Sequence, residues 1–147
     1  MNTHHRTILA ACMVAATTMS LAGCALLGTP RGDDGRVTES ATINSAALLV
    51  GDCFSFVDGT NLAKSIVTPC AEPHAYIVID QGELDAAAID AAGGLQNAVN
   101  AACDEPFATF KASAAEGVKP EQQFIVSRVE RDGKKFTAYS CVATDGV

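Results

Sequence analysis

The alternation of hydrophobic and polar residues between positions 46 and 79 predicts short β-strands separated by turns. Apolar residues gather at 46–50, where we expect ordered structure to begin. Residues 53–57 alternate as a strand with Phe54 and Phe56 on one face, and the following Asp-Gly-Thr-Asn ends it. Branched residues at 76–79 predict the next strand.

Residues 84–103 are rich in alanine and have the spacing of helices. Apolar side chains recur at intervals of three and four residues, and Gly93-Gly94 predicts a break between two helical pieces. Pro106 predicts a helix end and a new helical start, because proline fits the first turn of a helix but not its interior.

The C-terminal part of the chain predicts a β-hairpin, since residues 123–130 and 134–143 flank the turn signal Arg-Asp-Gly. Tyr139 and Cys141 share one face of the last strand, so a bond from Cys103 would lay the alanine-rich helix over that face. The predicted fold class is therefore α+β: a small antiparallel sheet with one or two helices packed on one face.

An apolar stretch follows Arg6 and ends at Leu-Ala-Gly-Cys24. It is too short and too rich in Thr and Ala for a permanent membrane span, so we predict a lipoprotein signal peptide at residues 1–23 and a diacylglycerol anchor on Cys24. An ordinary secretory cleavage site beside a chance cysteine is the alternative. The anchor would attach the protein to the outside of the cell membrane.

Composition divides the remaining chain into a tether and one domain. Residues 24–45 are rich in Gly, Thr, Ser, Asp and Pro and are expected to form a flexible tether, and residues 46–147 the domain. All 17 acidic residues lie beyond the signal peptide, where they outnumber the basic ones, and no basic stripe is present. This charge balance argues against a nucleic-acid partner.

Cysteines 53, 70, 103 and 141 remain after the signal peptide and the anchor. An even set in an oxidising compartment predicts two disulfides, for which three pairings are possible. We favour Cys53 with Cys70 and Cys103 with Cys141, because each bridge then joins segments that the local pattern places in one unit. A zinc site is the alternative, but no Cys-x-x-Cys pair exists, and we expect neither a metal nor a cofactor.

His74 is the only histidine beyond the signal peptide and, with Glu72 and Asp52, forms the set of candidate binding residues. Histidine as a residue type ionises near neutral pH, so any general-base chemistry or pH switching would fall to this residue. A Cys-His nucleophile would need Cys70 as a free thiolate, which the predicted bridge forbids. The structural alternative, which we favour, is that His74 makes a hydrogen bond that holds the following strand in register.

Aromatic residues on the predicted strands could line a ligand groove, although on alternating strands such residues usually belong to the core. They are Phe54, Phe56, Tyr76, Phe124, Phe136 and Tyr139. The sequence contains no Gly-rich phosphate loop, Ser-x-x-Lys or His-Glu-x-x-His motif, so no common catalytic motif is indicated.

Residues 50–54 (Val-Gly-Asp-Cys-Phe) and 67–74 (Val-Thr-Pro-Cys-Ala-Glu-Pro-His) resemble the signature of the septum-formation family, an extracytoplasmic domain common in actinobacterial membrane and secreted proteins. The resemblance spans about residues 48–142 and includes later cysteines at Cys103 and Cys141. Ile77 departs from it, since the family often has a glutamate there. The resemblance implies an envelope-associated domain.

These observations predict a non-catalytic cell-envelope lipoprotein. Its partners would be the membrane, through the N-terminal lipid, and another envelope protein or a cell-wall component. A small-ligand or metal-binding protein, or a weak hydrolase, centred on His74 is the alternative function.

Overall fold

The computed structural model describes residues 29–59 and 61–144, so the predicted signal peptide and Cys24 lie outside the described residues. The elements of this part, in chain order, are β1 (Ala41–Asn44), a 3-10 turn η1 (Ser45–Ala47), β2 (Cys53–Asp58), β3 (Asn61–Thr68), β4 (Tyr76–Leu84), α1 (Ala86–Ala91), α2 (Leu95–Ser113), β5 (Gln122–Arg131) and β6 (Lys134–Ala143).

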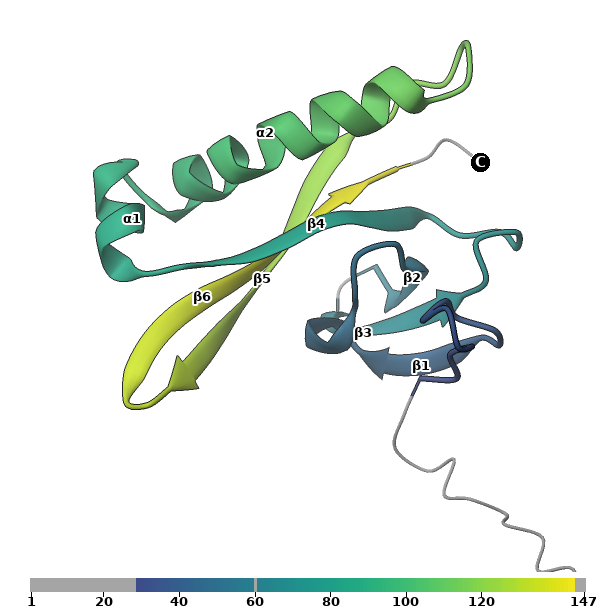
Figure 1. Ribbon diagram of the computed structural model, residues 1–147, viewed down its shortest axis with the longest axis horizontal. Coiled ribbons are helices and arrows are strands. Elements are labelled where there is room, and N and C mark those ends of the chain that lie inside the picture. The colour runs from purple at the N-terminus through teal and green to yellow at the C-terminus, as the bar shows by residue number, and fades with distance from the viewer. Residues whose placement is uncertain (1–28, 60, 145–147) are drawn as a thin grey trace, which may run out of the picture.

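Within the described residues the strands form one six-stranded antiparallel sheet with the order β1-β3-β2-β4-β6-β5. The long helix α2 lies across the β4–β6–β5 half (Figure 1). The predicted α+β class, an antiparallel sheet with helices on one face, is confirmed. Strands β2 and β4 share only the pairs Cys53↔Ile77 and Phe54↔Tyr76, so the two halves of the sheet meet at a short joint.

Two hydrophobic cores lie on opposite sides of the sheet. Cys141 and Val142 are successive residues of β6 and so point to opposite faces. Cys141 packs under α2 with Val99 and Cys103. Val142 instead belongs to a second core, with Phe54 and other residues of the β1–β3–β2 half. This second core therefore lies on the face of β6 away from α2.

The aromatic residues of the strands belong mainly to these cores. Phe54, Phe56 and Tyr76 contact one another with ring centroids 5.4 Å apart and pack in the core away from α2. Phe124 and Tyr139 pack under the helix. The preference for core over ligand groove is confirmed for these five residues, and Phe136 is half-buried.

Both favoured disulfides are confirmed. Cys53–Cys70 joins Cα atoms 5.2 Å apart, and Cys103–Cys141 joins Cα atoms 5.4 Å apart. The predicted hairpin is confirmed as well: β5 and β6 meet at Asp132 and Gly133, whose φ angles of 52° and 73° are those of a tight hairpin turn. The bridge from Cys103 places α2 over the face that Tyr139 and Cys141 share, as expected.

The predicted break at Gly93-Gly94 separates α1 from α2, but the expected helix end at Pro106 is wrong. Helix α2 continues through Pro106, although a proline in a helix interior destabilises the helix by about 3 kcal/mol. Buried Val99 and the disulfide of Cys103 hold the preceding turns on the sheet, and half-buried Phe107 and Phe110 follow on the next turn. Tertiary contacts before the proline, together with the partial burial of the side chains after it, thus outweigh its local preference.

The expected start of the ordered domain at residue 46 is also wrong. Strand β1 lies within the predicted tether and pairs with β3 from Ala41↔Val67 to Asn44↔Lys64. Further upstream, Val37 is buried in the core away from α2. Residues 29–45 therefore belong to the fold, because they supply an edge strand and a core side chain despite their polar composition.

Candidate functional site

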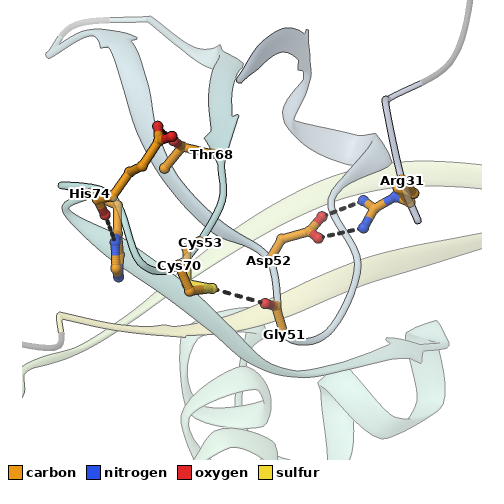
Figure 2. Close-up of a disulfide and its surroundings, with 8 residues drawn as sticks. Arg31, Gly51, Asp52, Cys53, Thr68, Cys70 and His74 are labelled. Carbon is orange, nitrogen blue, oxygen red and sulfur yellow. Dashed lines mark hydrogen bonds and ion pairs between the residues drawn. A yellow bond between two sulfur atoms is a disulfide. The ribbon is translucent and has the colours of Figure 1, made fainter. Parts of the chain in front are cut away.

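The two motif segments, residues 50–54 and 67–74, lie side by side in the structure. Strands β2 and β3 pair Cys53 with Thr68, and the Cys53–Cys70 disulfide fastens the loop after β3 to the start of β2 (Figure 2). The Sγ atom of Cys70 lies 3.6 Å from the carbonyl oxygen of Gly51. This sulfur is in the disulfide and has no proton to donate, so Cys70 is not available as the thiol of a Cys-His nucleophile.

Asp52 is a buried carboxylate that is paired with Arg31. Its side chain is 3 % exposed, and both of its oxygens accept hydrogen bonds of 2.6 Å from the Arg31 guanidinium. The backbone N–H of Leu49 donates a third bond, of 2.8 Å, to Oδ2. The hydrogen bonds that Arg31 donates to Asp52 raise the pKa of Arg31 above its ordinary value, although partial burial opposes this shift.

Glu72 belongs to a separate hydrogen-bond network. Its Oε2 accepts a bond of 2.9 Å from the Thr68 hydroxyl and a longer one of 3.4 Å from the Ser40 hydroxyl. The Ser40 and Thr68 hydroxyls are themselves 2.7 Å apart. This network joins the chain just before β1 to the loop that the disulfide closes.

His74 is buried, with 8 % of its surface exposed, in the turn that leads into β4. Its Nδ1 lies 2.7 Å from the backbone carbonyl oxygen of Glu72, and Nδ1–H must be the donor because a carbonyl only accepts (Figure 2). The next residue, Ala75, donates its N–H to the carbonyl oxygen of Phe54 and to the Ser55 hydroxyl, each at 3.1 Å. The imidazole thus closes the turn from which β4 starts.

The three candidate binding residues do not converge on one point. Asp52 is turned to Arg31, whereas Nδ1–H of His74 donates to the backbone oxygen of Glu72. Among residues 29–59 and 61–144, no group of three or more His, Cys, Asp or Glu side chains is placed to hold a metal ion. The geometry of the motif is that of a set of turns held by side chains.

A cleft of about 790 Å³ opens beside the motif, between the segment that carries Arg31 and the disulfide loop. Its walls include Leu49 and Val50, which are 50 % and 57 % exposed, together with Pro69 and Ile77. Sequence reasoning missed Arg31, because it stood in the predicted tether. The available signal was Asp52 itself, since a carboxylate that is buried at the start of a strand needs a cation or hydrogen-bond donors as partners.

A second cleft, of about 420 Å³, lies between η1 and the face of β4, β5 and β6 away from α2. The Gln81 amide crosses it and donates 2.8 Å bonds to the Leu48 carbonyl oxygen and to the Ser140 hydroxyl. Glu83 and Arg131 form an ion pair of 2.6 Å at its rim. The polar groups named here are therefore already engaged with one another.

The fold and the two disulfide bonds define a small, disulfide-stabilised α+β domain. Two disulfides are typical of a domain that works outside the cytoplasm. No helix in the described ranges is long and apolar enough to cross a membrane. Comparison with protein-family models, curated proteins and solved structures gave no match. The resemblance to the septum-formation family therefore stays a prediction that rests on the motif residues.

Proposed function

We propose that this chain is a lipid-anchored cell-envelope protein, akin to the septum-formation family, whose domain binds another envelope protein or a cell-wall component without catalysis. The lipid would be carried by Cys24, and the domain would be displayed outside the cytoplasmic membrane.

The exposed turn at Leu49 and Val50 is the observation that carries this proposal. The N–H of Asp52 bonds the Leu49 carbonyl oxygen at 3.0 Å, and Gly51 has a φ of 89°, so residues 49–52 form a tight turn. The Arg31–Asp52 pair and the bond from Gly51 N–H to the Val78 carbonyl oxygen at 2.8 Å hold this turn from both sides.

A rigid turn that presents two large apolar side chains beside a cleft suits recognition by shape. Anchoring side chains of this kind supply much of the affinity of protein interfaces, and preorganisation removes part of the entropic cost of binding. The acidic and imidazole groups of the motif meanwhile bond to the protein itself. Binding through the apolar turn therefore explains the arrangement better than chemistry at His74.

Site-specific photo-crosslinking in intact envelopes tests the binding role. A photo-reactive amino acid at position 50 should give one discrete adduct, with a protein or with peptidoglycan, that Leu49→Asp abolishes. The same amino acid at Val126, which is 39 % exposed on β5 outside this cleft, is the matched control. Equal adducts at both positions, or a discrete adduct that persists in Leu49→Asp, would contradict the proposal.

Mass mapping of the N-terminal peptide tests the anchor. A diacylglycerol-modified Cys24 supports attachment to the membrane, and an unmodified Cys24 indicates a secreted protein.

A further inference from the structure

The outer face of the β1–β3–β2 half carries exposed branched apolar side chains. Leu62 and Ile66 are 52 % and 38 % exposed. The two neighbours of Ile66 in the strand, Ser65 and Val67, are instead buried on the core side. Ile66 alternates with these two residues and so lies on the outer face of β3. Leu62 is exposed in the irregular stretch of the same strand, where residues 62–64 lie opposite Val57 of β2, which is 46 % exposed.

The neighbours of Ile66 on this face are small and uncharged. Thr42 of β1 and Ser55 of β2 stand directly opposite it in the two flanking strands. By the same alternation Lys64 lies on this face beside Ile66, and Thr68 lies on its other side and donates to the exposed carboxylate of Glu72. The face thus combines aliphatic groups, hydroxyl groups, one cation and, at the end near the disulfide loop, one anion, in a chain whose net charge is −7.

The described chain begins on this side of the molecule. Its purple start lies beside β1 and β3, at the end far from α2 (Figure 1). Cys24 precedes Thr29 by five residues, which can span at most about 18 Å when fully extended. A bilayer that holds Cys24 would therefore lie within about 18 Å of the start of the described chain, beside β1 and β3.

We propose that the outer face of β1–β3–β2 rests on the bilayer that holds the lipid anchor. This inference relies on the lipidation of Cys24 in the proposed function. Leu62 and Ile66 enter the boundary between headgroups and acyl chains, and the Lys64 ammonium extends to the lipid phosphates. The anchor keeps the face at high local concentration, so a weak apolar contact is enough to orient the domain.

The absence of tryptophan from the chain permits a direct test. The full-length acylated protein carrying Ile66→Trp is reconstituted in vesicles of phosphatidylethanolamine and phosphatidylglycerol with brominated acyl chains. Val126→Trp is the matched control, since Val126 is 39 % exposed and, by alternation with Phe124, lies on the α2 side of β5. We expect the emission of Trp at 66 to shift to the blue and to be quenched by bromine, and that of Trp at 126 to do neither.

Equal responses at the two positions overturn the proposed orientation, as does a water-exposed Trp at 66 in protein whose Cys24 is acylated. A blue shift that depends on protein concentration and not on brominated lipid also overturns it, because a second copy then covers the face. Leu62→Trp replaces Ile66→Trp if the latter fails to fold. An unmodified Cys24 in the mass map refutes the anchor and the orientation together, whereas failure of the orientation alone leaves the anchor intact.

Discussion

Arg31 and Asp52 form a two-point ion pair, with both N–O distances at 2.6 Å, that joins the start of the described chain to the tight turn before β2. The pair ties the segment that carries buried Val37 to the loop that carries Leu49 and Val50. It thereby positions both walls of the larger cleft. The pair thus couples the two walls of this cleft through residues 21 positions apart in the sequence.

Replacement of Arg31 should destabilise the domain. In Arg31→Met the buried carboxylate loses its cation, and we expect a loss of about 3 kcal/mol, the low end for a broken buried pair because Arg31 remains 18 % exposed to solvent. Urea denaturation measures the change. Arg36→Met is the control, since its side chain is 87 % exposed and should change stability little. Equal losses in the two variants would show that the Arg31–Asp52 pair does not stabilise the fold.

The two disulfides should contribute unequally to stability. Loops of 17 and 38 residues correspond to about 3 and about 4 kcal/mol in the chain-entropy model, so the double substitution to Ala at Cys103 and Cys141 should cost more than that at Cys53 and Cys70. Mild reductant should attack Cys53–Cys70 first, because Cys70 is exposed whereas Cys103 and Cys141 are fully buried. Denaturation and peptide mapping test both orders, and a reversed order in either would contradict them.

Gly82 allows the Tyr139 ring to pack directly against β4. A Cβ atom at position 82 would overlap the Tyr139 hydroxyl and lie 2.6 Å from Cζ. Gly82→Ala should therefore destabilise the domain by about 1–3 kcal/mol, the usual cost of overpacking. Gly59→Ala is the matched control, since nothing lies within 4 Å of its Cβ position. Thermal unfolding of the two variants gives the comparison, and a neutral Gly82→Ala would mean that the ring moves aside freely.

Tyr139 should ionise at a higher pH than a free tyrosine. Burial, with a smaller contribution from the negative charge of Asp80, raises the pKa of Tyr139 above its ordinary value of 10.0. The folded state then holds the phenol proton more tightly than the unfolded state, so the folded state is favoured less as pH rises through and above 10. Ultraviolet titration of Tyr76→Phe, which leaves Tyr139 as the single tyrosine, measures this pKa.

Asp80→Asn in the same background should lower that pKa only in part, because burial is the larger cause. A fall to the value of a free tyrosine would instead assign the whole shift to Asp80.

Local signals predicted the elements whose stability is local. The Arg-Asp-Gly sequence predicted a hairpin because Asp132 and Gly133 tolerate positive φ angles. Gly93-Gly94 predicted a helix end because glycine also adopts positive φ angles without strain. Alternation predicted the shared face of Tyr139 and Cys141, and with it the position of α2. The cysteine pairing followed because each bridge joins segments that already belong to one local unit.

Local signals failed where distant residues supply the free energy. Pro106 stays within α2 because the disulfide to Cys141 and the core under the helix hold the surrounding turns. The polar segment before β1 is ordered because Arg31 meets Asp52 and Val37 enters the core. The polar composition of this segment predicted a tether, because composition carries no information about contacts with residues far along the chain.

By itself, the sequence determined strands β2, β4, β5 and β6, the break between the two helices, the hairpin and the disulfide framework, because periodicity, turn residues and cysteine number act over short stretches of chain. Only the tertiary structure decided that Asp52 faces Arg31 while His74 closes a turn at Glu72. It also decided that the sheet carries a core on each side, which leaves Leu62 and Ile66 exposed on its outer layer. These outcomes depend on contacts between residues that are distant in the sequence and come together only in the folded protein, so local sequence patterns do not predict them.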